Sequence, residues 1–288
     1  MSQKTYDAVT ARILEALEKG VVPWQQPWGA GGVALGRHKN LISLKPYRGI
    51  NALLTGMQGY ESPYWLTYKQ AQELGASVRK GEKGTPIVYY GRVERENAEG
   101  KVEDFMFLKH SVVFNVAQVE GLKLKPELLK PAPEARPFAP IQVCQTLVDA
   151  MPQRPRIQHA EAKAYYSPSL DYVNMPKPEL FTKPERYYAT LFHELGHSTG
   201  HKDRLARKTL TKIAAFGDHA YSQEELVAEM TAAFLCAETG IENATEKASA
   251  SYLAHWIKHL KQDPKILIQA AGQAHKAADF IRGVKWET

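Results

Sequence analysis

The chain has 288 residues, of which 44% are hydrophobic and 24% are charged, and its formal net charge is +6 at pH 7. This length leaves room for two domains, each with a core of its own. No apolar stretch approaches the length of a membrane span, and the first residues lack the apolar centre of a signal peptide. The two cysteines, Cys144 and Cys236, are too few for a disulfide framework. We therefore expect a cytoplasmic protein with no membrane partner.

The positive charge is concentrated in the N-terminal half. Residues 1–125 hold 17 Lys and Arg against 12 Asp and Glu, a net of +5, whereas residues 126–288 hold 20 against 19, a net of +1. Eight of the 10 histidines lie in the C-terminal half. The first half is thus suited to an anionic partner and the second half to a metal ion.

Local patterns predict both helices and strands in the N-terminal half. An amphipathic helix is expected at the start, because apolar residues recur at helical spacing before a glycine, at Tyr6, Val9, Ile13, Leu17 and Gly20. Thr67 to Gln70 resembles a capping box, which predicts a short helix ending at Gly75. Residues 80–84 then form a basic turn that leads into a strand at 87–90, with a partner strand at 105–114.

Basic and aromatic residues are interleaved through this half. Phosphates need cations, and unpaired bases need flat rings to stack on, so the mixture favours single-stranded DNA over a duplex groove. Core tryptophans and an ordinary charged surface would give a similar composition, and this second interpretation stays open. The candidate DNA-binding residues are Lys45, Tyr47, Arg48, Asn51, Trp65, Tyr68, Lys69, Arg79, Lys80 and Lys83.

A proline-rich segment predicts the domain boundary. Residues 126–140 contain five prolines, too many for a helix or a central strand, and suit a semi-rigid linker. We therefore expect an N-terminal DNA-binding domain at 1–125 and a second domain at 141–288, with functions that mutation can separate.

The second domain contains the motif His193-Glu194-Leu195-Gly196-His197. Two histidines four residues apart on a helix can hold one metal ion, and the intervening Glu194 is placed to act as a general base. Apolar residues upstream at helical spacing support a helix that ends near Gly200. This is the signature of a zinc hydrolase, although a related ion such as manganese would also suit the site.

The third metal ligand is open among several residues. His201 and Asp203 lie near the position expected in one class of zinc peptidase, but neither matches its spacing. Glu225 and Glu229 fit the alternative class, in which a second helix supplies a glutamate. We favour Glu229, because Ser222 to Glu225 matches a capping box, in which the Glu225 side chain would bond the backbone N–H of Ser222. The opposite assignment, with Glu225 as ligand and Glu229 behind it, stays open.

Several linked motifs resemble the ArdC antirestriction family and the N-terminal module of plasmid TraC-type primases. They cover nearly the whole chain and include residues 47–51, 64–71, 78–84, 114–122, 171–176, the HELGH helix and residues 224–229. The resemblance implies an α+β protein with a single-stranded-DNA-binding module and a zincin-like metallopeptidase domain. It further implies a plasmid-encoded factor that protects incoming conjugative DNA from restriction.

Two functional hypotheses follow. In the first, the protein is a protease that cuts an unknown protein, such as a host restriction component; Glu194 is the general base, Tyr166 or Tyr221 stabilises the anionic intermediate, and an edge strand within 165–176 pairs with the substrate. In the second, the protein coats DNA and its metal site is structural or vestigial. The intact Glu194 favours the first hypothesis.

Overall fold

The structure is a computed structural model that describes residues 2–24, 38–96, 102–123, 140–211, 219–241, 243 and 250–284. Apart from Pro140, the predicted linker lies outside these ranges. The N-terminal half contains α1 (Ser2–Glu18), β1 (Lys39–Asn40), α2 (Ile50–Gly56), β2 (Tyr64–Thr67), α3 (Tyr68–Glu73), β3 (Ser77–Val78), β4 (Thr85–Glu96), β5 (Val102–Asn115), the 3-10 helix η1 (Val116–Gln118) and β6 (Val119–Glu120). The C-terminal half contains α5 (Pro140–Ala150), β7 (Arg156–Gln158), β8 (Tyr165–Ser167), β9 (Tyr172–Asn174), η2 (Pro178–Leu180), α6 (Pro184–Ser198), α7 (Lys208–Thr211), α8 (His219–Thr239), α9 (Ala250–Gln262) and α10 (Lys265–Ile281).

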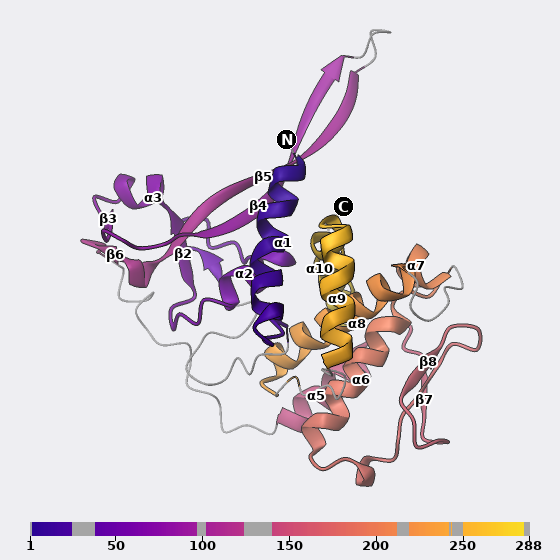
Figure 1. Ribbon diagram of the computed structural model, residues 1–288. Coiled ribbons are helices and arrows are strands. Elements are labelled where there is room, and N and C mark those ends of the chain that lie inside the picture. The colour runs from indigo at the N-terminus through magenta and orange to yellow at the C-terminus, as the bar shows by residue number, and fades with distance from the viewer. Residues whose placement is uncertain are drawn as a thin grey trace.

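Among the described residues, the N-terminal half has two sheets, of which the smaller pairs β3 with β6, and the C-terminal half has one. In the N-terminal half a four-stranded sheet has the order β1-β2-β5-β4, with β1 and β2 parallel and the other pairs antiparallel. Strands β4 and β5 continue beyond the sheet as a two-stranded arm that points away from the rest of the molecule (Figure 1). The C-terminal half has a three-stranded sheet of order β7-β9-β8, which leaves β8 at an edge next to α6 (Figure 1). The α+β fold class is therefore confirmed.

The N-terminal sequence patterns produce the expected local structures. The first helix ends at Glu18, and Gly20 adopts the left-handed conformation with φ of 76°. At α3, the Thr67 hydroxyl accepts from the Gln70 amide and the Gln70 side chain accepts from the Thr67 amide, so both halves of the capping box are present. The predicted pair of strands is present as β4 and β5, each longer than expected.

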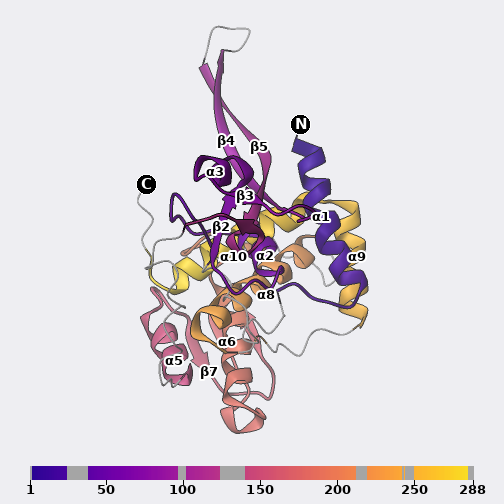
Figure 2. The ribbon, with the colours of Figure 1, turned by 90° about the vertical axis from the view of Figure 1, so that its left-hand side faces the viewer.

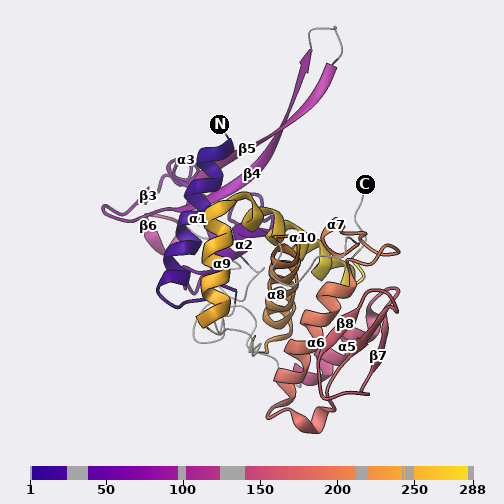
Figure 3. The same ribbon diagram turned by 45° about the vertical axis from the view of Figure 1, so that its right-hand side comes forward.

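One hydrophobic core joins the two halves of the chain. It includes Leu17 and Leu53 from the first half and Phe192 and Leu267 from the second. Helix α1 lies beside α9 (Figures 2 and 3). The buried rings of Trp24 and Trp256 meet there edge to face, with centroids 5.1 Å apart.

Polar contacts cross the same boundary. The Thr10 hydroxyl donates to the Pro264 carbonyl at 2.9 Å, and the Asn243 amide donates to the Trp24 carbonyl at 2.8 Å. Separating the two halves at the linker would therefore expose the apolar face of α1 to water. No helix within the described residues is long and apolar enough to cross a membrane.

The shared core makes a testable prediction about stability. Trp24→Ala should lower the free energy of unfolding of the whole chain by about 3–5 kcal/mol, as expected for a large buried aromatic residue. Urea denaturation followed by circular dichroism should show one transition at lower urea. Leu170→Ala, which removes a side chain that is 71% exposed, is the matched control and should change little. Two separate transitions, with only one shifted, would contradict the shared core.

Candidate metal centre

The candidate metal centre lies where helices α6 and α8 approach closely. A Cβ added to Gly196 on α6 would lie 3.2 Å from the Cα of Ala228 on α8 and 3.2 Å from the Cβ of Thr231. The absence of a side chain at Gly196 therefore sets how near the two backbones can come. Glu225 and Glu229, which flank Ala228 on α8, are thereby brought within reach of the histidines of α6.

Three side-chain atoms converge at this crossing. The Nε2 atoms of His193 and His197 are 3.2 Å apart, and the Glu225 carboxylate lies 3.7 Å from the first and 3.3 Å from the second. Tetrahedral coordination at bond lengths of about 2.0–2.2 Å places ligand atoms about 3.3–3.6 Å apart. All three residues are buried, and together they form a group with the spacing needed to hold a metal ion.

Glu229 faces the other side of His193. Its carboxylate lies 3.7 Å from Nδ1 of His193, the ring nitrogen that points away from Glu225. A carboxylate on this side of a metal-binding imidazole can orient the ring. The geometry therefore favours Glu225 as the third ligand, which reverses our preference for Glu229.

The reason for preferring Glu229 is also wrong. Helix α8 begins at His219, so Ser222 lies inside the helix and cannot be its N-cap. Glu225 therefore has no role in a capping box at the start of α8. His201 and Asp203 lie outside the cluster: the His201 ring accepts a hydrogen bond from the Asp203 amide at 3.3 Å.

His197 has a supporting carboxylate as well, which sequence reasoning missed. Glu224 lies 3.5 Å from Nδ1 of His197 and is held by Arg207, whose guanidinium also donates to the Gly196 carbonyl at 2.8 Å. Burial alone would raise the pKa of Glu224, but Arg207 and His197 outweigh burial and lower this pKa to about 2. Glu224 is therefore ionised at neutral pH, and Arg207 ties it to the end of α6.

The cluster carries more negative charge than its buried surroundings tolerate without a cation. Glu194, Glu224, Glu225 and Glu229 are each at most 5% exposed. Buried carboxylates are costly unless they are paired or bind a cation, and Arg207 pairs with Glu224. Two imidazoles and one carboxylate are the donors of many catalytic zinc sites, and the same set suits manganese. The residues present therefore fit a divalent metal ion.

The surrounding carboxylates strongly affect His197. Burial lowers the pKa of His197, but Glu225, Glu224 and Glu194 outweigh burial and raise this pKa to about 10. Without a metal ion, His197 therefore carries a proton at neutral pH. The carboxylates of Glu224 and Glu225 on α8 stabilise a positive charge at the position of this imidazole.

Tyr166 and Tyr221 are the candidate residues for stabilising the anionic intermediate. The Tyr166 hydroxyl donates to Asp171 at 2.8 Å and accepts from Arg204, so it is held in an ion-pair network that ties β8 to the segment after α6. The side chain of Tyr221 lies outside the part of the chain that the structure describes. Tyr166 is thus engaged elsewhere in this conformation.

Several candidate DNA-binding residues have structural roles. Trp65 is fully buried, and its indole N–H donates to His38 at 2.8 Å, so its expected stacking on a base is wrong. Tyr47 is also buried, at 9% exposure. The Asn51 side chain bonds both the N–H and the C=O of Val88, which fixes α2 to β4. Arg48 forms an ion pair with the buried Asp279 on α10.

The remaining candidates stay accessible. Arg79 is half-exposed, although Glu82 and the Ala117 carbonyl engage it. The exposed residues are Lys45, Tyr68, Lys69, Lys80 and Lys83, which lie on the turn after β1, on α3 and on the turn before β4.

Two family models match different parts of the chain. Residues 3–114 match the family model described as the N-terminal domain of anti-restriction factor ArdC, and residues 145–273 match that of a zincin-like metallopeptidase. The crystal structure of the antirestriction protein ArdC from plasmid R388, in its metal-free form, is 34% identical, with a TM-score of 0.74 over 96% of each chain. The chain belongs to the ArdC family. The Mn(II)-bound structure of the same R388 protein matches equally, over 96% of this chain and 97% of that one.

Other relatives of this ArdC family member have different lengths. The uncharacterized protein y4eC of Sinorhizobium fredii is 34% identical over 96% of this chain and 91% of its own. The DNA primase TraC of Escherichia coli is 35% identical over 96% of this chain, which spans only 27% of TraC. The ArdC-like unit thus also occurs within a much longer protein.

The arrangement of ligands makes a prediction about metal binding. Glu225→Ala should remove one of three donors and abolish stoichiometric zinc or manganese binding, as measured by elemental analysis after gel filtration. Glu229→Gln should retain the metal with about 10–100-fold lower affinity, because it only weakens the support of His193. Normal metal content in Glu225→Ala, with loss in Glu229→Gln, would restore Glu229 as the ligand.

The raised pKa of His197 makes a second prediction. A metal ion must displace the His197 proton, so binding should release a proton at pH 8 and metal affinity should rise with pH up to about 10. Because the folded-state pKa lies above the ordinary 6.5, this proton stabilises the metal-free protein below pH 6.5, and that stability is lost as pH approaches 10. Calorimetric titration with metal in two buffers of different ionisation enthalpy measures the proton count. A count of zero at pH 8 would show that His197 is already neutral.

Proposed function

We propose that this protein is an antirestriction factor that binds single-stranded DNA and acts as a metal-dependent peptidase, protecting incoming conjugative DNA. The observation that carries the peptidase assignment is the convergence of His193, His197 and Glu225 beside Glu194. A purely structural metal site needs no general base. Glu194 is buried and occupies the position of the general base in the HExxH motif, which favours catalysis.

When bound, a divalent ion would polarise the scissile carbonyl and lower the pKa of a water molecule. Glu194 then accepts the proton of the attacking water and passes it to the leaving nitrogen. Glu224 and Glu229 keep the two imidazoles oriented through their Nδ1 atoms. Each role uses a different carboxylate, which accounts for the concentration of acids at this crossing.

Edge strand β8 is the proposed docking site for the peptide. It pairs with β9 on one side, and its backbone on the other side has no partner strand among the described residues. An extended substrate could add to that edge antiparallel or parallel to β8, next to α6. The substrate is an unidentified protein; a restriction component of the recipient cell is one that fits the antirestriction role.

The proposed DNA surface consists of Lys45, Tyr68, Lys69, Lys80 and Lys83, with Arg79 beside them. The lysines offer charge to phosphates, and the exposed Tyr68 offers a ring to a base. Neighbouring Lys39 lies 5.1 Å from the centroid of the Tyr64 ring, so aromatic and basic groups also meet at the edge of this surface.

The alternative is a DNA-coating protein whose metal site is structural or vestigial. The core shared by the two halves is the observation that favours it, because a metal ion in α6 and α8 would then stabilise the DNA-binding half as well. The two functions differ in what Glu194 does, and a single isosteric substitution separates them.

Glu194→Gln should keep normal metal content and bind single-stranded DNA within about threefold of wild type, because glutamine fills the same space. It should nevertheless lose peptidase activity and, in a conjugation assay into a restricting recipient, lose protection. Lys177→Ala, which removes an exposed charge in the same half, is the control. Full protection by Glu194→Gln would leave the coating function standing.

The DNA surface is tested by salt dependence. The double variant Lys80→Ala, Lys83→Ala should bind single-stranded DNA more weakly, and its log–log salt slope should be shallower by about 0.7 for each phosphate that the variant no longer binds. Tyr68→Ala should lower affinity without changing that slope, because stacking releases no ions. Fluorescence anisotropy with an oligonucleotide at several salt concentrations measures both. An unchanged salt slope in the double variant would mean that DNA binds a different face of the protein.

A further inference from the structure

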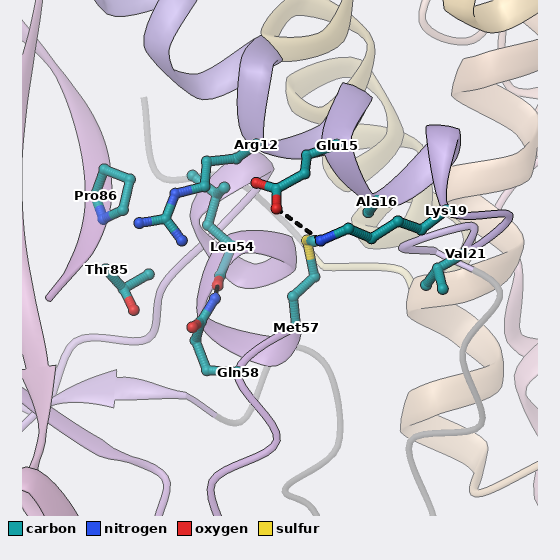
Figure 4. A pocket seen from close by; sticks show the side chains of 10 residues that line it. All are labelled: Arg12, Glu15, Ala16, Lys19, Val21, Leu54, Met57, Gln58, Thr85 and Pro86. Atoms are coloured by element: carbon teal, nitrogen blue, oxygen red, sulfur yellow. Dashed lines mark hydrogen bonds and ion pairs between the residues drawn. The ribbon is translucent and has the colours of Figure 1, made fainter. Parts of the chain in front are cut away.

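A groove opens on the N-terminal half between α1, α2 and the start of β4 (Figure 4). Its volume is about 240 Å³, which is below the about 300–1,000 Å³ of sites for drug-sized ligands. A site of this size suits a single small ring system. Nothing in the proposed peptidase chemistry uses it.

The walls of the groove are largely apolar. Leu54 and Met57 from α2, Ala16 and Val21 from α1 and the segment after it, and Pro86 from β4 line it. Apolar side chains can sandwich the faces of a base as aromatic ones do, and methionine sulfur adapts well to a ring. The groove can thus take a flat ring away from water.

Two polar groups lie among these walls. Thr85 is 2% exposed and lines the groove, where its hydroxyl can form a hydrogen bond with a ligand. Gln58 uses its amide N–H on the Leu54 carbonyl at 3.1 Å, which leaves its side-chain oxygen for a ligand. A hydroxyl and an amide oxygen can together read the edge of a base.

Positive charge borders the same groove. Arg12 is exposed and makes no hydrogen bond or ion pair with any described residue, and in Figure 4 its guanidinium points toward Pro86 and Thr85. Lys19 is paired with Glu15 at 2.7 Å. Hydrogen bonding to Lys19, with smaller contributions from Arg12 and Lys83, lowers the pKa of Glu15, so these cations surround one carboxylate. The rim therefore keeps a positive excess, and Lys83 links it to the proposed DNA surface.

We propose that this groove holds one unpaired base of a bound single strand, with the adjoining phosphate on Arg12 and Lys19. The inference rests on the proposed single-stranded-DNA function and names a contact site for it. Continuity along the turn at 80–84 gives the strand a path from the lysines to the groove. The apolar walls exclude water from the base, and the Thr85 hydroxyl forms a hydrogen bond with its edge.

The test compares the full-length protein on two probes of equal length, a thymidine oligonucleotide and the same backbone with every base removed. Thr85→Val should weaken binding of the thymidine strand about two- to tenfold, the value of one hydrogen bond, and leave binding of the abasic strand unchanged. Its melting temperature should not fall. Arg12→Ala should weaken binding of both probes and make the salt slope shallower by about 0.7.

Two further variants serve as controls, one expected to strengthen DNA binding and one expected to leave it unchanged. Glu15→Gln removes the one carboxylate among the described residues that line the groove, and should strengthen binding of both probes if a phosphate lies there. Lys177→Ala, in the C-terminal half, should leave the affinity for both probes unchanged. Photocrosslinking from a 5-iododeoxyuridine strand should label peptides that contain residues 54–58 or 85–86.

Different results would exclude the base-binding groove and single-stranded-DNA binding itself. If wild type binds the thymidine strand while Thr85→Val and Arg12→Ala match it, the groove is not the base site and DNA binding by the lysine surface stands. Crosslinks confined to residues 64–83 would lead to the same conclusion. If wild type binds neither probe, the single-stranded-DNA function itself is wrong.

Discussion

The close approach of α6 and α8 is the constraint on which the site depends. At Gly196 there is little space for a Cβ, because Ala228 and Thr231 lie 3.2 Å from where it would be. Any larger residue at 196 would push the helices apart, and the Glu225 carboxylate would no longer lie 3.3–3.7 Å from the two imidazoles. The HExxH motif contains the two proposed histidine ligands and the proposed base, and the packing of Gly196 against Ala228 brings Glu225, the proposed third ligand, next to them.

The sequence predicted local structure better than it predicted the direction of side chains. The helical spacing in α1, the capping box of α3 and the pairing of β4 with β5 depend on neighbours in the chain, and all three are present. Glu225 and Glu229 are one helical turn apart, so spacing alone cannot say which one faces Nε2 and which one faces Nδ1 of His193. A start of α8 at Ser222 would favour Glu229, but the helix begins three residues earlier, at His219.

The candidate DNA-binding residues were harder to place for a related reason. Composition counts tryptophans and arginines but does not say which surface they face. Trp65 lies on a central strand and is fully buried, with His38 as its polar partner. Arg48 lies in the loop before α2, where Asp279 of α10 takes its charge. Those partners lie 27 and 231 residues away in the chain, so no local pattern could have revealed them.

The shared core joins the candidate metal centre to the N-terminal half through helix α10. That helix contacts Gly49 at the start of α2, where an added Cβ would lie 3.5 Å from the Ala271 carbonyl oxygen, and it also packs on α8, which carries Glu225. A ligand that binds only the folded state stabilises it by about 2.7 kcal/mol at a free concentration about 100 times its dissociation constant. Because the two halves share one core, that stabilisation is not confined to the helices that hold the metal. The buried acids of α8 thus link metal occupancy to the stability of the surface proposed to meet DNA.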